Sequence, residues 1–410
     1  MQLPASGMSR EEIFTRFDEL AAADVRWRDG RVFSLAYSAG PEVLALAEDA
    51  YRRFSGENAL NVDAFPSLRR MQDDVVAIAR GWLGGPEDTA GFMTSGGTES
   101  LLLTVKAARD RGRAERGVRS PNMVLPASAH AALEKGAAYF DVESRRIPVR
   151  ADWRADADAM AAAIDDDTVL IVASAPQYPQ GVIDDVPAIA ALATARGVNC
   201  HVDACMGGVV LPYLDGVPPW NFDVDGVTSI SVDLHKYGYT AKGAGVLVHR
   251  SKALRRHQTF VTDNWLGGLY GSSGILGTKS GGSIAAAWAV LHHLGDDGYR
   301  RLAGLARRLA RRLADAIEQI PELWLLARPD TTLVAFRAAD PSTLDVVAVA
   351  AALRRRGWLV DQQGPPRSLH CMVNAVHEPT LDAFIADLRE CVADAGPPDG
   401  AGPSAYATVD

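Results

Sequence analysis

The apolar residues of this chain follow two distinct patterns. Between residues 41 and 51 they recur at helical spacing, with Val43, Leu44, Ala47 and Tyr51 on one side. From residue 169 to 173 every residue is apolar instead. An unbroken run of this length is typical of a strand buried on both faces of a sheet. The chain is therefore predicted to contain both helices and fully buried strands.

From about residue 65 these two patterns alternate along the chain. Helices are predicted at 41–51, 68–82, from 98 onward, 130–139, 186–195, 285–320, 342–356 and 380–393. Strands are predicted at 90–94, 123–126, 144–149, 169–173, 199–203, 226–232, 245–248, 332–337, 358–361 and 370–373. Alternation of this kind indicates right-handed crossovers and a mostly parallel sheet with helices on both faces. The fold class is therefore α/β.

A shift toward Ala, Leu and Arg after residue 282 suggests a second unit. We predict an N-terminal arm at 1–64, a large domain at 65–282 and a smaller C-terminal α+β domain at 283–395. Residues 396–410 are rich in Gly and Pro and are predicted to form a disordered tail.

Composition narrows the function classes. The 410 residues are 48% hydrophobic and 23% charged, with a formal net charge of −9. Such values are those of a globular protein, and a net negative chain is a poor nucleic-acid binder. The four cysteines lack metal-type spacing and suggest reduced thiols, so we expect a cytoplasmic protein without a metal site. The sequence shows neither a signal peptide nor an apolar segment long enough to cross a membrane.

The first candidate site is the turn that follows the strand at 90–94. Gly96 and Gly97 allow close approach of the backbone to a ligand, and the free N–H groups where the helix starts at Thr98 favour an anion. Hydroxyl groups at Ser95, Thr98 and Ser100 can add hydrogen bonds. The alternative is that Thr98 merely caps the helix.

Two further candidates follow later strands. Asp203 ends the strand at 199–203, where it can hold a protonated ring nitrogen, bind a metal or cap a turn. Lys236 comes directly after another buried strand. A desolvated lysine has a lowered pKa and can form a Schiff base. The alternative is a lysine that reaches solvent or pairs with Asp233.

The order of the three motifs carries more information than any one of them. A phosphate-binding turn, then an aspartate, then a lysine is the arrangement expected for pyridoxal 5'-phosphate. An aromatic side chain should cover the cofactor ring, and His130 lies in a loop at a suitable point between the turn and Asp203.

The chain also resembles the sphingosine-1-phosphate lyases, which belong to the pyridoxal phosphate-dependent decarboxylases of fold type I. The resemblance extends from about residue 37 to residue 373. It rests on the motifs at 65–70, 94–100, 128–131, 175–184, 201–208, 226–242, 263–268 and 357–358. The lysine block with its second lysine, Lys242, is more specific to the lyases than to decarboxylases in general.

The resemblance implies a role for each matching residue. Lys236 would form the Schiff base, Asp203 would hold the ring nitrogen and His130 would stack on the ring. His235, Gly97 and Thr98 would bind the cofactor phosphate. The remaining cofactor contacts it implies are Ser95, Gly96, Ser174, Asp233 and Gly282. Lys242 and Tyr37 match positions that grip the substrate phosphate, and the β-hydroxyl base would be Lys242, Tyr239 or Lys236.

The resemblance further implies a homodimer with shared active sites, in which Tyr37 and the loop at 277–282 reach across. The substrate would be a phosphorylated β-hydroxy amine, cleaved to a fatty aldehyde and phosphoethanolamine.

Two departures bear on the substrate. Asn61 stands where the lyases carry a histidine expected to help hold the substrate phosphate, and Lys279 stands where they carry an arginine. These leave open an amino-acid decarboxylase, or a lyase acting on another β-hydroxy amine or amino acid. A catalytically silent, cofactor-holding protein is a third reading, which the intact set of Lys236, Asp203 and His130 disfavours.

Overall fold

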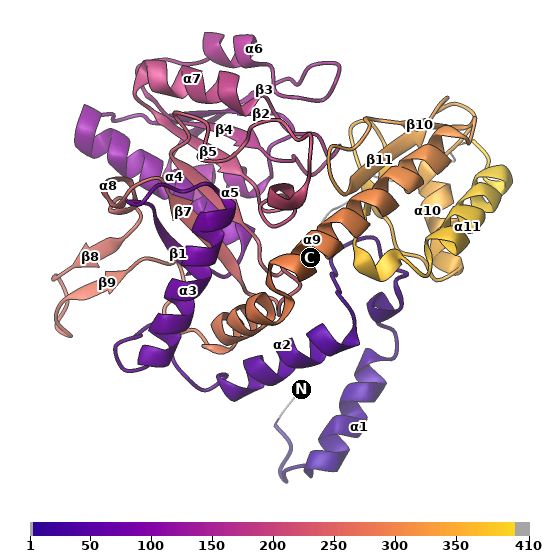
Figure 1. The fold of residues 1–410 in the computed structure, drawn as a ribbon, viewed down its shortest axis with the longest axis horizontal. Coiled ribbons are helices and arrows are strands. Elements are labelled where there is room, and N and C mark those ends of the chain that lie inside the picture. The colour runs from indigo at the N-terminus through magenta and orange to yellow at the C-terminus, as the bar shows by residue number, and fades with distance from the viewer. Residues whose placement is uncertain (1–2, 398–410) are drawn as a thin grey trace.

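The computed structural model of the protein describes residues 3–397 (Figure 1). The predicted tail therefore lies, beyond residue 397, outside the described residues. The structure contains a seven-stranded sheet, a four-stranded sheet and a two-stranded hairpin. The predicted α/β class is confirmed.

The large sheet has the order β1-β7-β6-β5-β4-β2-β3. Its strands are β1 (Ala90–Thr94), β2 (Asn122–Pro126), β3 (Glu143–Ile147), β4 (Thr168–Ser174), β5 (Asn199–Asp203), β6 (Ser229–Val232) and β7 (Gly245–His249). The five strands from β6 to β3 are parallel, whereas β7 runs antiparallel to both β1 and β6. The prediction of a mostly parallel sheet is correct.

The helices associated with this sheet are α3 (Pro66–Trp82), α4 (Gly97–Arg116), α5 (Ala132–Phe140), α6 (Ala157–Ala162), α7 (Val186–Arg196) and the short α8 (Lys252–Arg255). Alternate residues of a strand point to opposite faces, and β4 illustrates this. Leu170 and Val172 join the apolar cluster under α4 and α5. Ile171 and Ala173 join the cluster that contains Ile189 of α7. Both faces of the sheet are thus covered, which explains the unbroken apolar run.

The C-terminal unit packs helices on an antiparallel sheet of order β10-β11-β13-β12. Its elements are β10 (Leu323–Leu325), β11 (Leu333–Ala338), α10 (Val346–Arg355), β12 (Asp361–Gln363), β13 (Ser368–Met372) and α11 (Leu381–Asp394). The strand predicted at 358–361 is wrong in position, because β12 only begins at Asp361. Trp358 is 1% exposed and fills the core between elements, so its apolar character reflects packing and not a strand.

Helix α9 (Gly282–Glu318) joins the two units (Figure 1). The stretch predicted as helical at 285–320 is helical except at Gly295, which interrupts it with φ 58° and ψ −175°. Only glycine adopts such backbone angles readily. Past this break, Leu305 belongs to the C-terminal core whereas its neighbour Ala306 belongs to the core of the large sheet.

The N-terminal segment contains α1 (Arg10–Ala21) and α2 (Pro41–Arg53). Helix α2 lies along α9, and α1 projects from the body of the molecule (Figure 1). A capping box between Ser9 and Glu12 begins α1, which has no buried residue. The hairpin of β8 (Phe260–Thr262) and β9 (Tyr270–Ser272) was not predicted. Among residues 3–397, none of the helices is long and apolar enough to cross a bilayer.

Candidate active site

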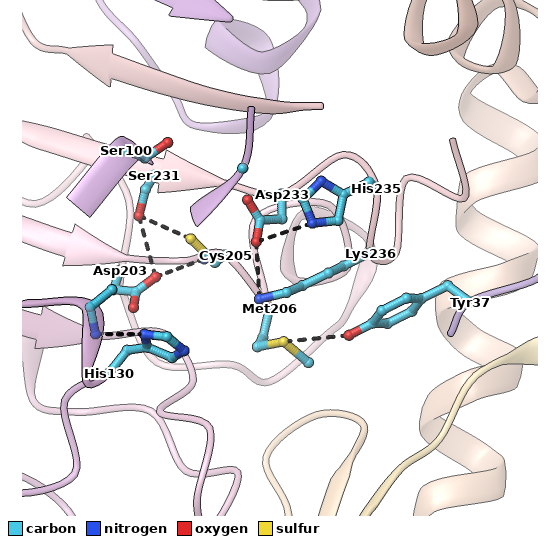
Figure 2. A network of polar contacts seen from close by, with 12 residues as sticks. Tyr37, Ser100, His130, Asp203, Cys205, Met206, Ser231, Asp233, His235 and Lys236 are labelled. Carbon is cyan, nitrogen blue, oxygen red and sulfur yellow. Dashed lines mark hydrogen bonds and ion pairs between the residues drawn. The ribbon is translucent and has the colours of Figure 1, made fainter. Parts of the chain in front are cut away.

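A cavity of about 270 Å³ opens where the parallel strands β4, β5 and β6 end. Open α/β sheets place their ligands at this edge. The wall brings together most of the predicted site residues: Ser95, Gly96, Gly97, Thr98, His130, Ser174, Asp203, Asp233, His235 and Lys236. Figure 2 shows Lys236 extending between Asp233 and Met206, and His130 and Asp203 lie beyond the Nζ end of the lysine. Residues far apart in the sequence therefore form one site.

The glycine turn is tightly enclosed. A Cβ atom at Gly96 would lie 2.6 Å from Cε1 of His235, and Gly96 has φ +137°. A Cβ atom at Gly97 would lie 2.9 Å from both Asp233 Oδ2 and Cys205 Sγ. Both positions therefore require glycine. The helix begins at Gly97 without a side-chain cap, so the alternative in which Thr98 caps it is wrong.

Asp203 is held by a backbone group just after β5 and by a side chain of β6. Its Oδ1 accepts hydrogen bonds from the backbone N–H of Cys205 (3.1 Å) and from the hydroxyl of Ser231 (3.3 Å). Burial alone would raise the pKa of Asp203, but the charge that His130 carries when protonated, the bond from Cys205 and the charge of Lys236 outweigh it and lower the pKa. The carboxylate at the cavity wall is therefore ionised.

Lys236 is paired with Asp233, because its Nζ lies 3.0 Å from Asp233 Oδ2. The prediction of a lowered lysine pKa is wrong for the protein without cofactor. Burial lowers the pKa of Lys236, but Asp233, Cys205 and Asp203 together, with the hydrogen bond to Asp233, outweigh that effect and the net shift is upward. His235 Nε2 lies 3.8 Å from the same Asp233 oxygen. Asp233 thus organises both basic residues.

His130 and Ser174 complete the wall. His130 Nδ1 accepts a hydrogen bond from the backbone N–H of Ala132 (3.1 Å), and burial lowers the pKa of His130. Its imidazole is therefore neutral near pH 7. The backbone N–H of Ser174 donates to Asp184 Oδ2 (2.8 Å), and burial raises the pKa of Asp184 to about 6. Asp184 thereby fixes the end of β4 at the cavity.

The residues present fit pyridoxal phosphate on chemical grounds. The turn at 95–98 lines the cavity at the start of α4, where free backbone N–H groups can hold a phosphate. Asp203 offers an ionised carboxylate to a ring nitrogen, and Lys236 offers an amine to an aldehyde. Asp233 Oδ1 is buried without a hydrogen-bond partner among the described residues.

Lys242 and Tyr37 lie close to this cavity. Lys242 Nζ donates to the carbonyl of Leu35 (2.8 Å) and lies 5.2 Å from the ring centre of Tyr37. Burial, with a contribution from the charge of Lys236, lowers the pKa of Lys242 to about 8. Lys242 lines a second cavity of about 150 Å³ together with Ser95 and Lys279. Two lysines therefore line a space adjacent to the glycine turn.

Three other predicted residues lie outside the cavity wall in this chain. Tyr239 is 6% exposed and burial raises its pKa, an unfavourable state for a base. Asn61 Oδ1 accepts from the backbone N–H groups of Asp63 (3.1 Å) and Ala64 (3.3 Å) in an exposed turn. Gly282 begins α9, and a Cβ atom there would meet the ring of Tyr51 at 2.8 Å.

Sequence reasoning missed the polar residues that support Asp203. His201 Nε2 lies 3.1 Å from the hydroxyl of Ser231, and His201 Nδ1 lies 2.9 Å from that of Ser229. Polar residues at alternate positions of two buried strands are the signal that could have found them.

The glycine turn also has an unpredicted partner. Glu99 Oε2 accepts from the backbone N–H of Ser95 (2.6 Å), and its Oε1 accepts from Ile275 (2.7 Å). The first turn of α4 is thereby tied to the segment after β9.

Comparisons with known proteins agree with this chemistry. The profile of the pyridoxal-dependent decarboxylase conserved domain matches residues 2–339. The chain is 38% identical to sphingosine-1-phosphate lyase 1 of Rattus norvegicus over 397 residues, covering 95% of this chain and 69% of that protein. It is 37% identical to the Arabidopsis thaliana sphingosine-1-phosphate lyase, covering 95% of this chain and 73% of that protein.

A solved structure gives the same result. The sphingosine-1-phosphate lyase of Burkholderia pseudomallei superimposes with a TM-score of 0.91 at 38% identity, covering 96% of this chain and 93% of that one. The Lactobacillus brevis glutamate decarboxylase, at 22% identity and a TM-score of 0.85, shares the fold. The chain therefore belongs to the pyridoxal phosphate-dependent decarboxylase family and, within it, to the sphingosine-1-phosphate lyase group of pyridoxal 5'-phosphate-dependent lyases.

Proposed function

We propose that the protein cleaves a sphingosine-1-phosphate-type substrate, a phosphorylated 2-amino-3-hydroxy chain, into a fatty aldehyde and phosphoethanolamine. In this reaction the 3-hydroxyl loses its proton, the C2–C3 bond breaks and C2 gains a proton. The observation that carries the proposal is the likeness to sphingosine-1-phosphate lyases over 95% of the chain, with Lys236, Asp203 and His130 around one cavity.

The bound cofactor supplies an aldehyde that links to the substrate amine and a ring that withdraws electrons from C2. Lys236 is proposed to hold the cofactor, and Asp203 to keep a proton on the ring nitrogen. His130 is proposed to pack on the ring face, and the turn at 95–98 with His235 to bind the cofactor phosphate. The ionised state of Asp203 and the position of Lys236 at the same wall support these roles.

The distal phosphate of the substrate is proposed to bind Lys242 and Tyr37. The bond that breaks is the one aligned with the ring's π system, so a fixed phosphate would decide which bond that is.

Lys236 is our choice for the base at the 3-hydroxyl, because it lines the cofactor cavity and Asp233 lies 3.0 Å away to stabilise its protonated form. Tyr239, buried and with a raised pKa, is disfavoured.

A homodimer is proposed to complete the site, with the loop at 277–282 reaching the partner, whereas Tyr37 contacts Met206 and Lys242 of its own chain. Exposed apolar side chains on α1 and around the β8–β9 hairpin support an interface there: Ile13, Phe14, Phe17, Leu20, Phe260, Val261, Trp265, Leu266 and Leu269.

The four buried free thiols agree with the expected cytoplasmic location.

A second candidate is a decarboxylase, or a lyase acting on a different β-hydroxy amine or amino acid. Asn61 favours it, because its side-chain oxygen is engaged in a local turn and its amide cannot supply the positive charge of a histidine.

The two candidates are separated by product analysis. The cofactor-loaded protein is incubated with a phosphorylated sphingoid base, and the products are identified by mass spectrometry. Fatty aldehyde together with phosphoethanolamine is the expected result. Absence of both products, from protein whose visible absorbance shows bound cofactor, would overturn the lyase proposal. Release of carbon dioxide from amino acids would then support the second candidate.

A further inference from the structure

A groove of about 390 Å³ lies beside the cofactor cavity. One wall is the loop at 127–131 that precedes α5, and the other is β12 with Gly364 from the C-terminal unit. His130 and Tyr178 line both the groove and the cofactor cavity. The groove therefore continues the cofactor cavity, and its size is within the range of small-molecule sites.

The charged side chains of the groove are already paired within the protein. Arg146 pairs with Glu134 and also donates to the carbonyls of Ala127 (3.0 Å) and Ala129 (2.9 Å). Asp361 Oδ2 accepts the hydroxyl hydrogen bond of Tyr178. Arg146 and Glu134 thus offset each other's charge, and Asp361 has one carboxylate oxygen engaged by the hydroxyl of Tyr178.

The remaining surface is largely apolar. The methyl groups of Ala127, Ala129 and Ala131, the ring of Pro179 and the ring of Tyr178 line it. Two side-chain hydrogen bonds from β12 fix its width: Asp361 to the Tyr178 hydroxyl, and Gln363 Nε2 to the carbonyl of Pro179. The groove is thus a preformed slot that links the two units of the chain.

We propose that this groove binds the hydrocarbon chain of the substrate, with Tyr178 at its junction with the cofactor cavity. The inference rests on the proposed function, whose substrate carries a polar end that belongs in the cofactor cavity and an apolar chain that must leave it. Continuity through His130 and Tyr178 gives the chain a route, and the apolar wall of the groove suits an alkyl group. Each methylene that enters such a slot tightens binding by up to about fourfold.

The test uses Ala131→Trp to fill the groove. Ala131 is exposed, lines the groove and has φ −60° and ψ −19°, which a tryptophan adopts without strain. The matched control is Ala138→Trp, at an exposed position on the same helix that is not among the groove-lining residues. Both holoenzymes are assayed with phosphorylated 2-amino-3-hydroxy alkanes of increasing chain length, below their micelle concentrations.

For the unaltered protein and for Ala138→Trp, we expect kcat/KM to rise with chain length. For Ala131→Trp we expect the short substrates to be cleaved as before, whereas KM for the longest rises by about tenfold or more at unchanged kcat. Equal chain-length profiles for the two variants, or no dependence on chain length in the unaltered protein, would overturn the groove assignment.

A binding measurement separates this outcome from failure of the proposed function. Saturated amine phosphates without the 3-hydroxyl are titrated by calorimetry. A heat-capacity change that becomes more negative with chain length, and that Ala131→Trp abolishes, supports the groove even if no substrate is cleaved. Cleavage by the unaltered protein without such a signal keeps the function and rejects the groove.

Discussion

Asp233 Oδ2 lies 3.0 Å from Nζ of Lys236, and this carboxylate is the foremost of the groups that together outweigh the effect of burial on the lysine pKa. Both residues belong to the segment that directly follows β6, so the pair is formed by the turn itself. In the absence of cofactor Lys236 is therefore a protonated amine paired with Asp233. It becomes a neutral amine only when Asp233 gains another partner.

Replacing Lys236 tests the cofactor attachment. Lys236→Ala should leave no visible cofactor absorbance after dialysis and no turnover, because no other lysine among residues 3–397 lines the cavity wall. Lys252→Ala, at an exposed lysine on α8, is the control and should behave like the unaltered protein. Cofactor that stays covalently bound to the Lys236→Ala protein would contradict the assignment.

Replacing Asp203 tests the ring-nitrogen partner. Asp203→Asn keeps the size of the side chain but removes the negative charge that a protonated ring nitrogen needs. We expect kcat to fall by at least about a hundredfold, the scale of a lost proton-holding group. Cofactor absorbance should persist with a changed pH dependence. Asp225→Asn, at an exposed aspartate, should change neither quantity. Full activity in Asp203→Asn would rule out the role.

The pKa of Lys242 predicts the alkaline limb of the pH profile. Burial lowers that pKa to about 8, so the ammonium is present below pH 8 and is lost as the pH rises through it. If the ammonium grips the substrate phosphate, kcat/KM must fall above about pH 8. Lys242→Arg should move this limb to higher pH, because a guanidinium stays charged. An unphosphorylated analogue should not show this alkaline fall in kcat/KM. If the fall stays the same in Lys242→Arg and with that analogue, Lys242 does not bind the substrate phosphate.

The glycine turn predicts a strict size limit. Gly96→Ala places a Cβ atom 2.6 Å from His235 at a backbone angle that L residues avoid, so cofactor affinity should fall by about tenfold or more. Gly117→Ala is the matched control, because φ is also positive there (+70°) but nothing lies within 4 Å. It should cost only about 1 kcal/mol of stability and leave the cofactor affinity unchanged. Equal cofactor affinity in the two variants, measured by equilibrium dialysis, would contradict this account.

The fold could be predicted where local pattern and burial agree. The strands at 90–94 and 199–203 have the predicted bounds, since each fits the alternation of helices and strands and is followed by a turn. The β8–β9 hairpin could not be predicted in this way, because its partly exposed strands show no buried face. The break at Gly295 was missed although the cluster Gly295-Asp296-Asp297-Gly298 is a local turn signal that could have indicated it.

The site was predictable to the extent that its chemistry lies in single segments. The turn at 95–98, Asp203 and Lys236 each follow a strand, and their order indicated the cofactor. The partners that tune them lie on other strands: Ser231 bonds Asp203 across two paired strands, and Asp361 reaches Tyr178 from the C-terminal unit. Such contacts depend on strand register and domain packing, which no local pattern encodes.

Helix α9 has a mechanical consequence for the groove. Leu305 and Ala306, adjacent on this helix, anchor in different cores, so neither core can turn against the other without bending α9 between them. The groove has one wall on each unit, and α9, which packs in both cores, fixes the distance between the two walls. The length of alkyl chain admitted is therefore a property of the whole scaffold, and changes in the second half of α9 would alter it from a distance.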